Sequence, residues 1–152
     1  MASSPRVDGL REHIGRYFVG HRFEDLKAPV PPGISRLGGV RILRVSPGPR
    51  TPLWTYMTIG ASSVAGREGA PRSEYFIVTK EPTKAAILLL ARAAHFHAGP
   101  ESQRLGLGDT FPFGEPWLPG SECEYGLICH AYILDPDLEI FQGPEMHAHI
   151  TW

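Results

Sequence analysis

Glycine and proline divide this chain into short apolar runs, and this division limits what it can fold into. Seventeen glycines and fifteen prolines are spread over 152 residues, of which 42% are hydrophobic. Short apolar runs bounded by turn-forming residues are typical of strands. A chain of this length and composition can also bury a sizeable core in one domain. We therefore expect a single domain over residues 1–152 with many turns.

Two segments carry a helical pattern. Apolar residues recur at helical spacing between Val7 and Val19, which predicts an amphipathic helix whose stripe faces a sheet. The members of the stripe are Leu10, Ile14, Tyr17 and Phe18. The segment from Pro82 to His97 is rich in alanine and leucine, and a proline suits the first turn of a helix. We expect this second helix to be apolar almost all round and to pack in the core.

Seven runs rich in β-forming residues account for much of the remaining chain. Three precede the second helix, at Val40–Val45, Trp54–Ile59 and Glu74–Thr79. Four shorter ones follow it, around Asp109–Phe113, Tyr125–Ile133, Leu138–Phe141 and Met146–Trp152. The predicted class is α+β, with a largely antiparallel or mixed sheet on which the N-terminal helix and the central apolar helix pack.

The charges divide unevenly along the chain. The first 100 residues carry fourteen basic and seven acidic side chains, whereas residues 101–152 carry one base and nine acids, so the two parts stand at +7 and −8. A surface of one sign steers and holds a partner of the opposite sign. The alternative is that the two segments interleave in space and their charges cancel.

Two His-x-His pairs, His95/His97 and His147/His149, are the sharpest chemical signal, because imidazole is a common zinc ligand. On a strand, His147 and His149 point to the same face. On a helix, residues two apart lie about 200° around the axis, so His95 and His97 cannot share a metal ion within a regular helix. The alternative is that all four are surface histidines, at a helix end and on a strand.

Other catalytic and ligand-binding signals are weak. The segment 60–66 lacks the spacing of a serine nucleophile elbow, and the glycines near residues 33–39 and 106–108 do not form a phosphate-binding loop. Arginines between residues 36 and 50 lack the interleaved aromatics of a nucleic-acid surface. Cys123 and Cys129 suit neither a redox pair nor a zinc site, and we expect reduced, partly buried thiols. We therefore expect no catalytic residue, no cofactor or metal, and no nucleic-acid partner.

The chain gives no signal for a membrane. Its first residues lack the apolar segment of a signal peptide, and its longest apolar stretch, residues 85–91, is too short to span a bilayer. We expect a cytoplasmic protein, and nothing in the sequence favours one oligomeric state.

Several short motifs resemble, in order, those of the suppressor-of-fused-like domain family. The stretch from Thr58 to Ser62 is similar to a "threonine, apolar, glycine, apolar, serine" turn of that family, and it is followed by Ser73–Val78 and the apolar helix. Further along, the sequence resembles the family's "Gly-Asp", "Pro-Trp-x-Pro-x-Ser" and "aromatic then Asp-Pro" features at Leu107–Thr110, Pro116–Ser121 and Tyr132–Pro136. Together these motifs span about residues 40–150, most of the chain.

The resemblance implies a non-enzymatic protein-binding domain and, for bacterial relatives, an immunity protein that neutralises a toxin. Animal members clasp a short peptide as an added strand, and the aspartate at their binding site matches Asp109. The aromatic residue that they place on the preceding helix falls near Ala93, which is a departure. Relatives also continue beyond a strand like His149–Trp152, so we expect this domain to be truncated or to lack its last element.

We therefore expect an acidic face that binds and blocks a basic protein toxin, since many such toxins are nucleases with cationic clefts. The predicted contact residues are Asp109, Glu122, Glu124, Asp135, Asp137 and Glu139. Each of these could instead be a solvated turn residue. Two other functions remain open: a metal-dependent enzyme that uses the His-x-His pairs, and a regulatory or scaffolding module that binds a peptide strand.

Overall fold

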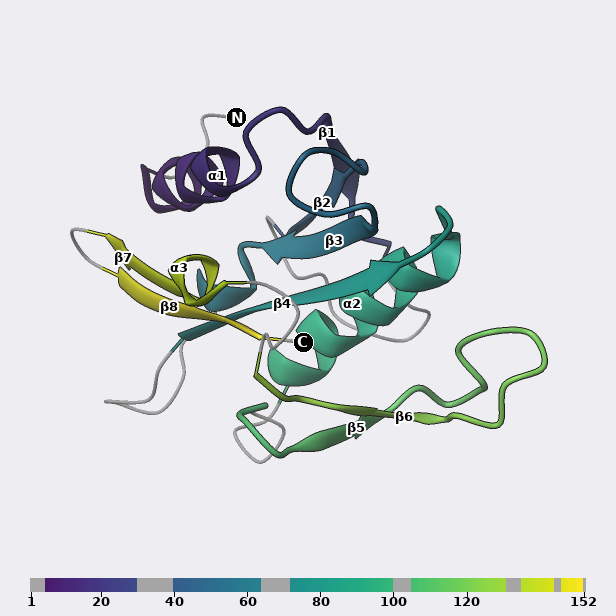
Figure 1. Cartoon of the computed structure of the whole chain (residues 1–152). Helices are drawn as coiled ribbons and strands as arrows, with labels where there is room; N and C mark the ends of the chain where they lie inside the picture. The colour runs from purple at the N-terminus through teal and green to yellow at the C-terminus, as the bar shows by residue number, and fades with distance from the viewer. Residues whose placement is uncertain are drawn as a thin grey trace.

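The structure is a six-stranded mixed sheet with helices on both faces and a separate two-stranded ribbon (Figure 1). It is a computed structural model that describes residues 5–29, 40–63, 72–99, 105–130, 135–143 and 146–151. The predicted α+β class and mixed sheet are confirmed.

The strand order of the main sheet is β1-β2-β3-β4-β8-β7. Neighbouring strands are antiparallel except β4 and β8, which are parallel. These strands are β1 (Phe23–Lys27), β2 (Arg41–Val45), β3 (Trp54–Ile59), β4 (Arg72–Thr79), β7 (Ile140–Gly143) and β8 (Met146–Thr151). The ribbon pairs β5 (Thr110–Pro112) with β6 (Tyr125–Leu127). The helical elements are α1 (Pro5–Tyr17), a 3-10 turn η1 (Ala61–Ser63), α2 (Lys84–His97) and α3 (Pro136–Glu139).

Both long helices form where the apolar periodicity predicted them. The first lies two residues earlier than expected, and the second begins at Lys84, because Thr83 caps it. The side-chain oxygen of Thr83 accepts the N–H of Ala85 at 3.1 Å, so Pro82 precedes the cap and is not in the first turn. The helix is also not enclosed on all sides, since Leu88 is exposed.

Three elements differ from the sequence prediction. The expected strand Leu138–Phe141 is wrong in its first half, because the N–H of Leu138 donates to the Asp135 carbonyl and starts the helical turn α3. Strand β1 was not predicted, because its sequence lacks an alternating apolar pattern. It is an edge strand joined to β2 and α1 by ion pairs of Glu24 and Asp25 with arginines. The expected strand around Tyr125–Ile133 ends at Leu127, and residues 131–134 lie outside the described residues.

The central strands bury apolar side chains on both faces of the sheet. Because successive residues of a strand point to opposite faces, Leu43 packs on one side and Ile42 on the other. The first face is covered by α1 and α3, through the predicted stripe of α1 and through Leu138. The second face is covered by α2 and the β5–β6 ribbon. The sheet therefore divides the molecule into two apolar layers.

A carboxylate, Glu74, is completely buried in β4. Its oxygens accept hydrogen bonds from the hydroxyls of Thr58 and Ser62, both at 2.6 Å. They also accept the N–H groups of Gly60, Ala61 and Ser62 at 2.9, 3.2 and 3.1 Å. Gly60 has a φ of +106°, a conformation that L side chains rarely adopt. The stretch Thr58–Ser62, which carried the family resemblance, is thus a loop closed around one carboxylate.

Burial raises the pKa of Glu74, and the hydrogen bonds from Ser62, Thr58 and the backbone oppose this rise without cancelling it. The folded chain therefore binds more protons than the unfolded chain between the ordinary pKa of 4.5 and the raised value. Under this linkage, the stability that Glu74 contributes is fully present below pH 4.5 and is lost as the pH rises through the raised pKa.

We predict that Glu74→Gln lowers the free energy of unfolding by about 2–3 kcal/mol, because the amide presents an N–H₂ group to donors that need an acceptor. The difference in stability between wild type and variant should shrink as the pH rises above 4.5. Urea unfolding of both proteins between pH 4 and 8 measures it. Glu81→Gln, at an exposed position, is the control. Parallel pH profiles for wild type and Glu74→Gln would contradict the prediction.

Candidate functional site

Residues 105–130, named the arm here, follow α2 in the chain and include the β5–β6 ribbon. The base of the arm is fixed at Leu105, which is buried. Its N–H donates to Nδ1 of His97 at 2.9 Å, and its carbonyl accepts the hydroxyl of Tyr75 at 3.4 Å. Both backbone groups of one residue are thereby bound to α2 and β4, so the arm starts from a defined point.

The ribbon is shaped by an aromatic ring packed over a glycine. Phe111 pairs with Gly126 across the strands. A Cβ atom at Gly126 would lie only 2.4 Å from Cε1 of the Phe111 ring, so no other residue fits there without displacing it. Phe113 packs edge-on against Phe111, with ring centroids 5.3 Å apart. Phe111 also contacts Phe96 of α2, with ring centroids 6.2 Å apart.

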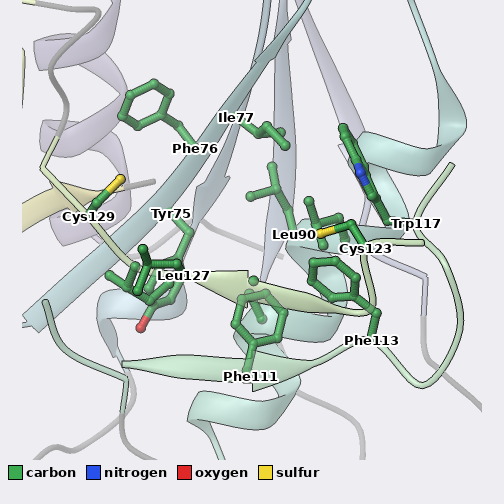
Figure 2. Close-up of a pocket in the computed structure, with 14 residues that line it drawn as sticks. Tyr75, Phe76, Ile77, Leu90, Phe111, Phe113, Trp117, Cys123, Leu127 and Cys129 are labelled. Carbon is green, nitrogen blue, oxygen red and sulfur yellow. The ribbon is translucent and has the colours of Figure 1, made fainter. Parts of the chain in front are cut away.

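An apolar groove of about 270 Å³ lies between the arm, β4 and α2. Figure 2 shows Phe111 and Phe113 on the arm side of this groove, with Tyr75 and Leu90 from the sheet and helix and with Trp117 beside it. The lining residues contain no carboxylate, imidazole, amine or guanidinium. They are Tyr75, Phe76, Ile77, Leu89, Leu90, Ala93, Phe111, Phe113, Trp117, Cys123, Gly126, Leu127, Ile128 and Cys129. Such a lining suits binding of apolar side chains.

Three of the six predicted acidic contact residues lie on the arm, at exposed positions: Asp109, Glu122 and Glu124. The arm contains no lysine or arginine. Its fourth acid, Glu115, forms an ion pair with Arg92 of α2 at 2.7 Å. The arm is therefore an acidic surface beside an apolar groove.

The other predicted contact residues lie with α3, on the opposite side of the sheet (Figure 1). Asp135 is held within the fold, because its carboxylate accepts NH1 of Arg50 at 2.9 Å and the hydroxyl of Tyr17 at 3.3 Å. Asp137 is exposed. The side chain of Glu139 lies outside the described residues. The six acids therefore do not share one face.

The histidines of the first His-x-His pair are not at the surface as expected. His95 and His97 are only 5% and 6% exposed, and His97 is bound to Leu105. His97 packs against Tyr75 of β4 and Leu105 of the arm, contacts that the sequence pattern could not predict. The side chains of His147 and His149 lie outside the described residues. Within the described residues, no cluster of three histidine, cysteine or acidic side chains could hold a metal ion.

The two cysteines are free thiols that line the groove. Cys129 is half-buried, and burial raises the pKa of its thiol. Cys123 is exposed, so the expectation of partial burial is wrong for this residue.

The sequence pattern did not indicate the groove, because aromatic residues in strands are typical of a core. The signal in the sequence was the pair Phe111 and Phe113, the first of which lies opposite Gly126 in the next strand. Among the described residues, no helix is long and apolar enough to cross a bilayer.

We predict that Gly126→Ala lowers the free energy of unfolding by about 1–3 kcal/mol, because the added methyl group displaces the Phe111 ring. Gly15→Ala in α1 is the matched control, since a Cβ there meets no atom within 4 Å. That variant should be unchanged or up to about 1 kcal/mol more stable, owing to helix propensity. Thermal and urea unfolding of Gly126→Ala and Gly15→Ala measure the difference. Equal stabilities of the two variants would contradict the packing of the Phe111 ring over Gly126.

Comparison with known proteins gives one informative match. No protein-family model matches the chain, and no curated protein matches it. Among solved structures, the chain is similar to the crystal structure of a proposed SUFU (suppressor of fused protein) homologue from Neisseria gonorrhoeae FA 1090, with a TM-score of 0.75 and 21% sequence identity. The match covers 95% of this chain and 75% of the other. The chain therefore has a suppressor-of-fused-like fold, as its motifs predicted.

Proposed function

We propose that this chain is a non-enzymatic protein-binding domain whose groove holds an extended segment of a partner protein. The observation that carries the proposal is the groove itself, which is open, apolar and rich in aromatic side chains. Aromatic-lined pockets of this kind take apolar anchor residues of a partner, and such anchors supply most of the energy of an interface.

Two further features support binding of an extended segment. Within the described residues, β5 and β6 pair only with each other, so each strand has an outer edge without a neighbouring strand. Tyr125 and Leu127 of β6 are large apolar residues that remain exposed. Strand edges beside apolar side chains are a common way to bind peptide segments. The resemblance in sequence to a family whose animal members clasp a peptide leads to the same function.

Within this function, we propose that the partner is a basic protein toxin and that the domain acts in the cytoplasm as an immunity protein. Support comes from the charge of the arm, which has four acidic side chains and no basic one. The acids near α3 do not contribute to this surface, since they lie on the other side of the sheet. The proposed contact set is therefore limited to Asp109, Glu122 and Glu124.

The test uses the tagged chain and two variants as baits to capture partner proteins from lysate of the source organism. Leu127→Ser changes a groove residue that is 58% exposed, and Val19→Ser changes a residue outside the groove that is 71% exposed. We predict that one basic protein is recovered with wild type and with Val19→Ser, and that Leu127→Ser recovers about tenfold less of it.

Circular dichroism and thermal unfolding establish that both variants fold. Washing the bound material at rising salt tests the electrostatic part, since contacts between exposed charges weaken with ionic strength. Equal recovery by the two serine variants would contradict the groove as the binding surface. A partner whose recovery requires Leu127, but which resists high salt or is acidic, would still support a protein-binding domain. It would contradict the proposed immunity function.

A further inference from the structure

The two ends of the β5–β6 ribbon carry one acid each, and these acids flank the groove. Asp109 lies opposite Ile128, whose N–H donates to the Asp109 carbonyl at 2.8 Å. Glu124 lies opposite Phe113, whose N–H donates to the Glu124 carbonyl at 2.7 Å. Ile128 and Phe113 both line the groove, so each acid lies across the ribbon from a groove residue.

The spacing of the acids is set by the register of the ribbon. Asp109 is four residues from Phe113 along β5, which corresponds to about 13 Å at the rise of an extended chain. Phe111, in the groove, lies midway. In an extended segment, residues i, i+2 and i+4 point to the same side. A segment lying along β5 therefore places its first and fifth side chains beside the two acids when its third side chain lies beside Phe111.

Both acids are available to a partner. Neither forms an ion pair with another described residue, in contrast to Glu115, which binds Arg92. Oδ2 of Asp109 accepts the N–H of Gly106 at 2.7 Å, which orients the carboxylate and leaves Oδ1 without a hydrogen bond to any described residue. The arm contains no lysine or arginine, so a basic partner can supply the charge that complements these two positions.

We propose that the bound segment has the pattern basic-x-apolar-x-basic, with lysine or arginine at the first and fifth positions and an aromatic or large aliphatic residue at the third. This inference rests on the proposed function, because it names the partner of the same groove. The apolar residue supplies the affinity through burial in the groove, which Phe111 and Leu127 both line. The two basic residues fix the register of the segment and accelerate its association.

The test uses three fluorescein-labelled peptides and fluorescence anisotropy at low salt. The first is Gly-Ser-Lys-Ser-Phe-Ser-Lys-Ser-Gly. The second, Gly-Ser-Lys-Lys-Ser-Phe-Ser-Ser-Gly, has the same composition and a different spacing, and the third has glutamate in place of both lysines. We predict that the first binds about five- to tenfold more tightly than the second, that the third binds most weakly, and that these differences shrink at high salt.

Variants of the chain test whether the two acids cause the preference for the first peptide. Glu124→Lys should lower the affinity for the first peptide about threefold or more and raise the affinity for the third. Asp109→Asn should also weaken the first peptide, and it keeps an oxygen for the Gly106 N–H, so the turn is preserved. Asp137→Lys, at an exposed position beyond the sheet, is the control and should change neither affinity.

The outcomes separate this inference from the proposed function. Equal affinities of the first two peptides would overturn the charge pattern. If Leu127→Ser still weakens both peptides, the groove remains the binding surface. The absence of binding by all three peptides would also overturn the pattern, while the capture experiment decides the proposed function independently. Self-association of the chain that Leu127→Ser abolishes would assign the groove to a second copy and would overturn the proposal.

Discussion

Burial of apolar side chains on both faces of the sheet is the constraint on which the rest of the structure depends. A sheet with two apolar faces must be covered twice. Helix α1 and the turn α3 close the first face, with Leu138 in the cluster. On the second face, α2 covers β2, β3 and β4, and the arm packs beside it. Because a two-stranded ribbon covers less than a helix layer, an apolar groove remains at this seam. The candidate binding surface is thus a consequence of how the second layer is completed.

The sheet also contains one polar constraint, the carboxylate of Glu74. Five donors from a single turn satisfy it, which is how a buried acid is accommodated in an apolar core. The next residue links this turn to the arm. The N–H of Tyr75 donates to the Thr58 hydroxyl oxygen at 2.9 Å, and its own hydroxyl donates to the carbonyl of Leu105. One stretch of β4 therefore holds both the carboxylate loop and the base of the arm.

Apolar periodicity was sufficient to predict α1, α2 and the central strands, because burial determines those segments. It could not predict β1, where cross-strand ion pairs of Glu24 and Asp25 replace burial. Nor could it place the acids, since the distance along the chain does not reveal that Asp137 and Glu124 lie on opposite sides of a sheet. His97 of α2 is bound to Leu105 of the arm, a contact between elements that have no shared local pattern. Phe111 and Phe113 resemble ordinary core residues in sequence, and only the fold shows that they border a groove.

The most direct test of the groove as the binding surface is hydrogen exchange of the full chain, free and bound to the partner that it captures. We expect slower amide exchange on binding in β5, β6 and the adjoining part of α2, because these elements border the groove. Exchange in α1 and α3, on the other face, should be unchanged. Protection concentrated in α1 and α3, with the arm unaffected, would contradict the groove as the site of binding.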